Sequence, residues 1–261
     1  RIPHKFVVSG SGSVELKEKI HESLAGRKLL FHLNTLSFEE FLDFKTTYKY
    51  SGRLDEFCEL EKSGLLEPLF DEYIKFGGYP RVVLSETSEE KGRIIDEIYS
   101  SYLIKDISYL LKAEKMDALR ELFRVLSSQI GQLINYSELS SVIGVSQETL
   151  KNYIYYAEKT FVMERISPFY RNARKEIVKS PCAYFTDIGL RNYCAGDFGR
   201  GIGTSMGNGF IFQNFVYLLL KGFLKNANDK ISFWRTKEKA EVDFVIDKAD
   251  GTLGTVSATK L

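Results

Sequence analysis

The pattern of the last thirty residues constrains the fold most. Residues 231–235 form a short apolar and aromatic run, and Val242, Phe244 and Ile246 alternate with polar or smaller neighbours over residues 241–246. A period of two indicates a β-strand. Asp250-Gly251 then marks a turn. We therefore expect two strands, a turn and a further strand beginning near Thr255.

The same alternation places two carboxylates, Glu241 and Asp243, on one strand face with Val245 beside them. Such a pair is a candidate catalytic site, since carboxylate oxygens suit a hard divalent cation. The alternative is an ordinary solvated strand face. We favour that alternative and predict no metal site.

A helix-turn-helix pattern occupies the middle of the chain. Apolar residues recur at helical spacing over 116–134, Asn135 can cap a short helix, and Gly144-Val145-Ser146 is a turn before a helix predicted over 147–163. This order is typical of DNA-binding helix-turn-helix units. The first turn of the second helix carries four candidate DNA-binding residues, Gln147, Thr149, Lys151 and Asn152.

A basic segment follows and reads as a hairpin, with strands at 164–167 and 176–179. Residues 151–180 contain seven basic and three acidic side chains, whereas the whole chain has a net charge of only +1. We expect Arg171, Arg174 and Lys175, in the loop of this wing, to contact phosphates. The alternative is a unit that packs on another protein and leaves a solvated basic face.

Three further helices are indicated upstream. Ser37 and Glu40 form a capping box for a helix. A second helix, over 65–77, ends at Gly77-Gly78-Tyr79-Pro80, and a long one is expected over 89–111. Asp187 is expected to cap the turn or helix that Gly189-Leu190 begins.

Six groups of residues occur in the order seen in one prokaryotic family. They are Val7-Val8-Ser9-Gly10-Ser11, Leu24-Ala25-Gly26-Arg27, Leu36-Ser37-Phe38-Glu39-Glu40-Phe41, Gly77-Gly78-Tyr79-Pro80, Tyr184-Phe185-Thr186-Asp187-Ile188-Gly189-Leu190, and Phe233-Trp234-Arg235 with Glu241-Val242-Asp243-Phe244. In this order they resemble predicted ATPases of the AAA superfamily that carry a C-terminal winged helix and a restriction-endonuclease-like domain of unknown function.

The resemblance implies an α+β fold in four regions. These are an AAA-type core and lid remnant over 1–46, a helical connecting segment over 47–115, a winged helix over 116–180 and a small mixed α/β nuclease-like domain over 181–261. It also implies that Ser11 and Arg27 contact nucleotide, because guanidinium groups pair well with phosphate oxygens. ATP and magnesium would be the cofactors of the full-length protein, and none is expected in this fragment.

The chain departs from the family pattern at both sites. No Gly-x-x-x-x-Gly-Lys-Ser/Thr run is present, so we interpret the chain as the C-terminal part of a longer protein. In the nuclease-like region, Gln213 stands where the family has Glu, and Ser257 and Thr259 replace the Glu and Lys of Glu-x-Lys. Asp243 with Glu241 then forms a degenerate nuclease site.

Composition limits the remaining possibilities. Three widely spaced cysteines fit neither a disulfide framework nor a zinc site and favour a reducing, cytoplasmic location. The longest apolar run, residues 215–220, is far below the roughly 20 residues of a membrane span.

We expect the C-terminal portion of an AAA-family ATPase that contacts double-stranded DNA or a partner protein through a winged helix. The alternatives are a metal-dependent DNA nuclease and an interaction module without catalysis. The sequence does not give the oligomeric state.

The missing phosphate loop yields the first prediction. The 261-residue chain should bind ATP no better than background, because it lacks the backbone cradle and lysine that hold the phosphates. Isothermal titration with ATP and magnesium should give no saturable heat. A micromolar dissociation constant would contradict the interpretation.

Overall fold

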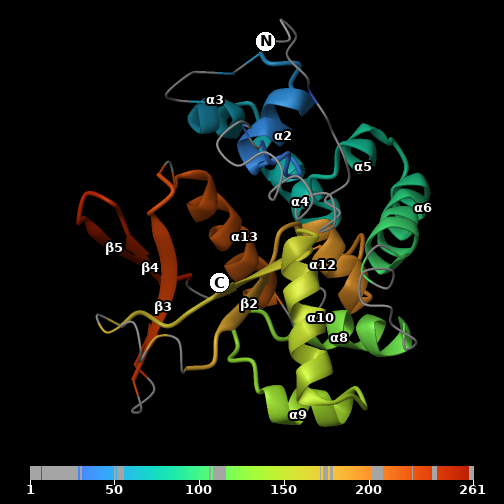
Figure 1. Ribbon diagram of the computed structural model, residues 1–261. Helices are drawn as coiled ribbons and strands as arrows, with labels where there is room; N and C mark the ends of the chain where they lie inside the picture. Colours follow the sequence, from blue (N-terminus) through green and yellow to red (C-terminus); the bar gives the residue numbers. More distant parts are fainter. Residues whose placement is uncertain are drawn as a thin grey trace, which may run out of the picture.

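The structure is a computed structural model of mixed α and β content (Figure 1). It describes residues 7, 29, 31–49, 51, 56–105, 107, 116–170, 172, 176, 179–201, 208–224, 226–236 and 240–258. No helix in these ranges is long and apolar enough to cross a membrane.

Five helices form the N-terminal half of the described chain. They are α2 (Phe38–Lys45), α3 (Glu56–Lys62), α4 (Leu66–Phe76), α5 (Pro80–Leu84) and α6 (Ser88–Glu97). The predicted capping box is confirmed, since the Ser37 hydroxyl accepts from the Glu40 N–H and the Glu40 carboxylate accepts from the Ser37 N–H. The predicted stop at Gly77 is also confirmed.

The second half alternates helices and short strands. It contains a π-helical segment η1 (Ile98–Ile104), then α8 (Met116–Ser128), α9 (Tyr136–Val142), α10 (Gln147–Lys159), β1 (Met163–Ile166), β2 (Cys182–Phe185), α12 (Ile188–Ala195), α13 (Asn208–Gly222), β3 (Lys230–Arg235), β4 (Glu241–Asp247) and β5 (Leu253–Val256). The strands predicted over 231–235 and 241–246 are confirmed as β3 and β4.

Three predicted helices have different ends. The helix expected over 89–111 starts at Ser88, where Thr87 caps it, and becomes π-helical at Ile98. The helix expected over 116–134 ends at Ser128, before the chain turns at Gly131. The helix expected over 147–163 ends at Lys159, because Phe161 adopts a left-handed conformation with φ 59° and the chain then enters β1.

Strand pairing differs from the predicted wing. The antiparallel partner of β1 is β2, with Met163 opposite Phe185. Residues 176 and 179, which are the described residues of the second strand expected for the wing, do not lie in a strand. On the other edge of β2, the Ile134 N–H donates to the Pro181 carbonyl at 2.9 Å, so residues 131–134 add a short third row. The domain boundary expected between residues 180 and 181 therefore lies between β1 and β2, which pair with each other.

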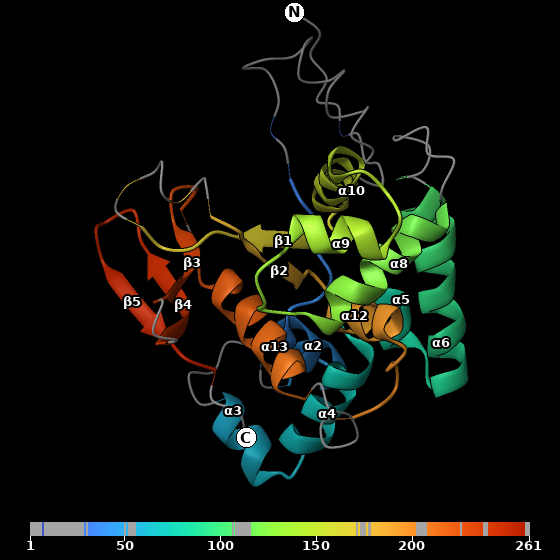
Figure 2. The same ribbon diagram turned by 90° about the horizontal axis from the view of Figure 1, so that it is seen from below.

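The antiparallel sheet β3-β4-β5 adjoins this unit (Figure 2). The chain leaving β1 runs beside β3, where the Phe169 N–H donates to the Phe233 carbonyl at 2.6 Å. A common core joins both sheets to α8, α10 and α12, and Tyr184 packs between Tyr217 of α13 and Phe244 of β4. A second cluster, in which Phe38, Phe41, Tyr73 and Phe215 pack together, joins α2, α4 and α13.

A buried carboxylate, Asp187, ties α4 to α12. Its two oxygens accept from the backbone N–H groups of Gly78 and Leu190, each at 2.8 Å. This confirms the predicted cap and adds a contact 109 residues away. A Cβ on Gly77 or Gly189 would lie well inside van der Waals contact with this junction.

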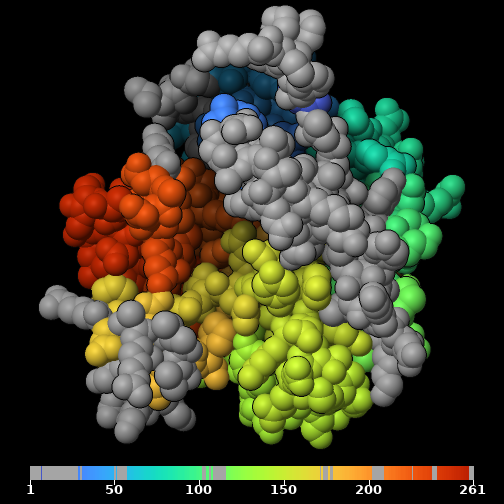
Figure 3. Space-filling view, in the orientation of Figure 1, coloured from blue at the N-terminus to red at the C-terminus, as the bar shows by residue number. Residues whose placement is uncertain are grey.

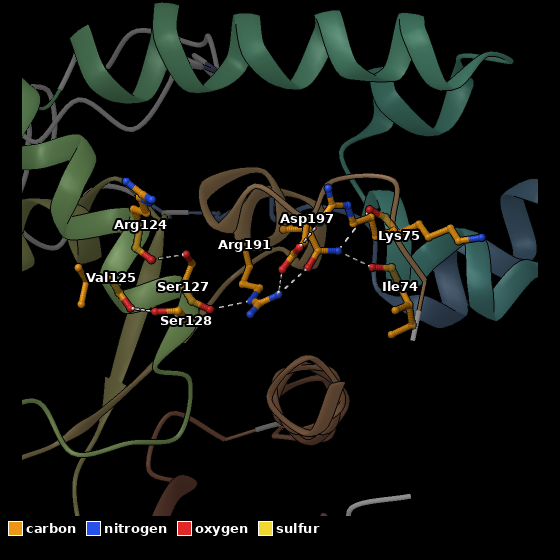
Figure 4. A network of polar contacts seen from close by, with 10 residues as sticks. Ile74, Lys75, Arg124, Val125, Ser127, Ser128, Arg191 and Asp197 are labelled. Carbon is orange, nitrogen blue, oxygen red and sulfur yellow. Dashed lines mark hydrogen bonds and ion pairs between the residues drawn. The ribbon is translucent and has the colours of Figure 1, made fainter. Parts of the chain in front are cut away.

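A buried arginine joins three helices next to it (Figure 4). The Arg191 Nε–H of α12 donates to the Ser127 carbonyl of α8 at 2.8 Å. Its Nη1 donates to Asn192, whose amide in turn donates to the Ile74 carbonyl of α4 at 2.7 Å. Asp197 lies 4.0 Å from the guanidinium. Burial nevertheless lowers the pKa of Arg191 below its ordinary value.

Glu72 of α4 bridges two lysines. Its carboxylate lies 2.8 Å from Lys45 of α2 and 3.1 Å from Lys91 of α6, and Lys91 is almost fully buried. Burial alone would raise the pKa of Glu72, but the hydrogen bonds and charges of the two lysines bring it below the ordinary value.

The close packing around Asp187 predicts an unusually large loss of unfolding free energy for Gly77→Ala. Gly77 has φ +74° and no room for a methyl group, whereas Gly64 has φ +70° and open space around it. Gly64→Ala should cost about 1 kcal/mol of unfolding free energy from backbone strain alone. Gly77→Ala should cost at least about 3 kcal/mol more. Urea denaturation measures both, and equal losses would refute the steric argument.

Glu72→Gln should lower the unfolding free energy by about 2–4 kcal/mol at neutral pH, because it leaves the buried Lys91 without its counter-charge. Since the folded pKa of Glu72 is depressed, the difference should persist above pH 4.5 and shrink as the pH falls below it. The exposed Glu59–Lys62 pair supplies the control. Glu59→Gln should change stability by less than about 0.5 kcal/mol.

Candidate functional site

The two helices expected on either side of the Gly144 turn are present as α9 and α10. The Asn135 side chain accepts from the Glu138 N–H and caps α9, and the Ser146 hydroxyl accepts from the Thr149 N–H at 3.0 Å and caps α10. Leu150, Ile154 and Ala157 bury one face of α10 in the core. The opposite face of α10 is therefore presented to solvent.

That exposed face contains most of the predicted DNA-binding residues. Gln147, Lys151 and Asn152 are exposed, whereas Thr149 is half-buried and its hydroxyl lies 2.9 Å from that of Ser146. Figure 3 shows α9 and α10 as a continuous outer surface. The structure thus brings three of the four side chains together and assigns Thr149 to the cap.

Two aromatic residues extend this surface and were missed from the sequence. Tyr155 lies one turn beyond Lys151 on the helix and is exposed, with the Lys159 ammonium 5.4 Å from its ring centroid. Tyr136 of α9 lies beneath Lys151, whose ammonium is 6.0 Å from its ring. The i, i+4 spacing of residues 147, 151 and 155 in the sequence places Tyr155 on the same helix face as Gln147 and Lys151.

One of the seven basic residues in the segment 151–180, Arg165, is paired with a carboxylate of the protein itself. The Arg165 guanidinium donates to both carboxylate oxygens of Glu158, at 2.8 and 2.6 Å, and to the Tyr136 hydroxyl at 3.0 Å. These hydrogen bonds raise the pKa of Arg165. Arg165 therefore fixes β1 to α10.

The wing residues themselves are not described. Arg171, Arg174 and Lys175 lie outside the described residues, as do Ser11 and Arg27 of the predicted nucleotide contacts. At the end of the wing, Glu176 forms an ion pair with Lys230 of β3.

A polar cluster on β4 occupies the place of the predicted nuclease site. The Asp243 carboxylate accepts from the Gln213 side-chain amide of α13 and from the Ala258 N–H, both at 2.8 Å. Glu241 lies 2.7 Å from Arg235 of β3, and Arg235 also donates to the Gly131 carbonyl at 2.9 Å. Each carboxylate is thus satisfied by a protein donor.

Burial raises the pKa of Asp243; the Ala258 N–H opposes this, and the neighbouring Glu241 carboxylate adds to the increase. Cys182, beside the cluster, donates to the Gly131 carbonyl, and burial raises the pKa of its thiol to about 12. This thiol is therefore not a nucleophile at neutral pH.

The cluster does not form a set of metal ligands. Within the described ranges, no three His, Cys, Asp or Glu side chains are grouped to hold an ion. Gln213 points a donor, not an acceptor, at Asp243. Ser257 is exposed, and Thr259 lies outside the described residues. These hydrogen bonds can hold α13 and the loop before α9 against the sheet β3-β4-β5.

Comparisons with known proteins relate the chain to AAA-type ATPases. Residues 67–200 match a family described as "Domain of unknown function (DUF8612)", residues 208–256 match "Domain of unknown function (DUF4143)", and residues 1–42 match an AAA domain. No solved structure matches. The family matches agree with the resemblance to AAA-type proteins at the level of the superfamily.

Curated relatives are themselves uncharacterized. A Haemophilus influenzae protein is 26% identical over 254 residues, covering 95% of this chain and 57% of the relative. A Methanocaldococcus jannaschii protein is 26% identical over 246 residues, covering 92% and 52%, and a Mycobacterium tuberculosis protein is 24% identical over 247 residues, covering 94% and 50%. The chain spans about half the length of the curated relatives it matches.

The Gln213–Asp243 hydrogen bond predicts the response to divalent cations. The wild-type chain should show no change in melting temperature with Mg²⁺ or Mn²⁺ and should not cut DNA. Gln213→Glu should melt several degrees lower without metal, because it sets a second carboxylate against Asp243. Mn²⁺ should restore part of that loss, since the variant offers three carboxylates.

Gln213→Leu is the matched control, because it removes the hydrogen bond without adding charge and should not respond to Mn²⁺. Cleavage by the wild-type chain that Asp243→Ala abolishes would show that this site is an active nuclease.

Proposed function

Since the chain belongs to the family described as "Domain of unknown function (DUF8612)", whose name carries no activity, we propose its function from geometry. We propose that it is the non-hydrolytic part of an AAA-type ATPase and that it contacts double-stranded DNA through α10. The AAA-domain match at residues 1–42 supports the ATPase assignment.

The observation that carries the proposal is the exposed polar face of α10. The exposed face of α10 carries Gln147, Lys151 and Asn152, and the other face of the helix is buried. Side chains of these types read base edges in the major groove. In known helix-turn-helix units, the N-terminal part of the second helix enters the major groove.

The order of elements around α10 supports a winged helix. A helix, a short extended row at 131–134, two helices and the pair β1-β2 follow one another, with the row and β1 on opposite edges of β2. We propose that the winged helix extends through β2, beyond the boundary expected at residue 180. The wing is then the segment between β1 and β2, which contains Arg171, Arg174 and Lys175.

The charge distribution predicts weak, salt-dependent binding. Arg165 is paired with Glu158, and Lys151 and Lys159 each lie over a tyrosine ring, so the wing arginines and lysine would supply most phosphate contacts. We do not propose the nuclease alternative, because protein donors satisfy both Asp243 and Glu241.

A protein partner is the second candidate. Val142 of α9 and Tyr155 of α10 are exposed apolar side chains on the outer surface of the helix-turn-helix, and aromatic residues are enriched at protein interfaces. The DNA experiment below separates the two candidates.

Replacement of Arg171, Arg174 and Lys175 by Ala should flatten the slope of log K against log salt by roughly two to three units for duplex DNA, at about 0.9 per phosphate contact. Replacement of Gln147 and Asn152 should instead change sequence preference with little effect on the slope. Fluorescence anisotropy across a salt series measures both.

A control variant loses the same charge elsewhere. Lys62, Arg81 and Arg93 lie on α3, α5 and α6, away from α10 (Figure 1), and their replacement by Ala should leave the slope unchanged. An unaltered slope in the wing variant, with its fold confirmed by circular dichroism, would favour the protein partner.

A further inference from the structure

The outward face of α10 carries a carboxylate, Glu148, among the residues that the proposed function assigns to DNA. Six side chains of this helix are exposed, namely Gln147, Glu148, Lys151, Asn152, Tyr155 and Lys159. At 3.6 residues per turn they fall within an arc of about 140°, and Glu148 lies between Lys151 and Asn152 on that arc. A ligand that contacts both of these residues therefore meets Glu148 as well.

Glu148 is not engaged by the protein itself. Residues 135–164 contain four acidic side chains. Each of the other three, Glu138, Glu158 and Glu164, accepts a hydrogen bond from another side chain of the protein. Within the part of the chain that the structure describes, no hydrogen bond or ion pair involves the Glu148 carboxylate. Its charge is therefore available to a ligand.

The lysine one turn along the helix does not neutralise this charge. Lys151 follows Glu148 at the spacing of a helical ion pair, but its ammonium lies 6.0 Å from the centroid of the Tyr136 ring. The Tyr136 hydroxyl accepts from Arg165 at 3.0 Å, and Arg165 is bound to Glu158. Tyr136 is thus fixed in place, and it is the contact of Lys151 that the structure shows.

A free carboxylate is unfavourable on a surface that faces DNA, because it repels the phosphates. This cost is offset where the carboxylate accepts a hydrogen bond from a base. In the major groove, cytosine presents only a donor, its N4 amino group, whereas guanine presents only acceptors. Thymine presents an acceptor and a methyl group, and adenine places the N7 acceptor beside its N6 donor. Cytosine is therefore the base that suits a glutamate.

We propose that Glu148 accepts a hydrogen bond from the N4 amino group of a cytosine and is a specificity-determining residue of α10. This inference rests on the proposed contact of α10 with double-stranded DNA and adds a base that the helix selects. Gln147 and Asn152, which share the exposed face, have side chains that suit adenine. The preferred duplex should therefore combine a cytosine with adenine.

A glutamate in the first turn also stabilises a helix through the helix dipole. That contribution concerns the stability of the fold and is the same for every DNA sequence. Glu138 lies in the first turn of α9 and is also exposed, so it supplies a matched control for the loss of a first-turn carboxylate.

Selection from a pool of random duplexes tests the proposal. The wild-type chain should retain duplexes in which cytosine is enriched roughly tenfold at one position. Glu148→Gln should prefer adenine at that position, because glutamine pairs with N6 and N7 of adenine. Glu148→Ala should show no preference there and should bind non-specific DNA more tightly, because the repulsion is removed. Glu138→Gln should keep the wild-type preference.

Circular dichroism and thermal melting establish that each variant is folded. If the alanine variant loses its fold, the glutamine variant, which keeps the size of the side chain, decides alone. An identical base preference in the wild type and the Glu148 variants, with salt-dependent binding retained, would overturn this inference and leave the proposed function standing. Absence of duplex binding by the wild-type chain in the anisotropy series would overturn both.

Discussion

The buried Asp187 carboxylate is the constraint on which the rest of the structure depends. It accepts backbone N–H groups at the end of α4 and the start of α12, and its neighbours Gly77 and Gly189 leave no space for side chains. A charge this deeply buried persists only when it is fully hydrogen-bonded. The two helices must therefore meet at one fixed distance, which in turn positions Arg191 against α8 and Leu36 against Gly78.

The unit formed by α8, α9, α10 and the strands β1 and β2 is built outward from this centre. The Arg191 contact with Ser127 fixes the end of α8, the row at 131–134 lies against β2, and the Glu158–Arg165 pair holds β1 on α10. What remains outside is a short polar face on α10.

The cluster on β4 illustrates how one neutral residue changes a site. A glutamate at position 213 would face Asp243 and Glu241 and require a cation. Glutamine instead donates to Asp243, while Arg235 balances Glu241. Because Arg235 also reaches the Gly131 carbonyl, these side chains now join the C-terminal sheet to the loop before α9. The hydrogen bonds of this cluster stabilise contacts between elements.

The sequence by itself determined the features that depend on near neighbours. The caps at Ser37, Asn135 and Ser146 and the glycine stop at Gly77 were predictable, because their hydrogen bonds span only a few residues. The strand β4 was predictable because its side chains alternate between two faces. The two helices α9 and α10, with Gln147, Lys151 and Asn152 on the exposed face of α10, followed from the same local rules. Only the tertiary structure decided the partner of β1, the ends of α8 and α10, the pairing of Arg165 and the donors around Asp243. Those depend on groups that the chain brings together from many residues apart, and no local pattern encodes which donor reaches which carboxylate.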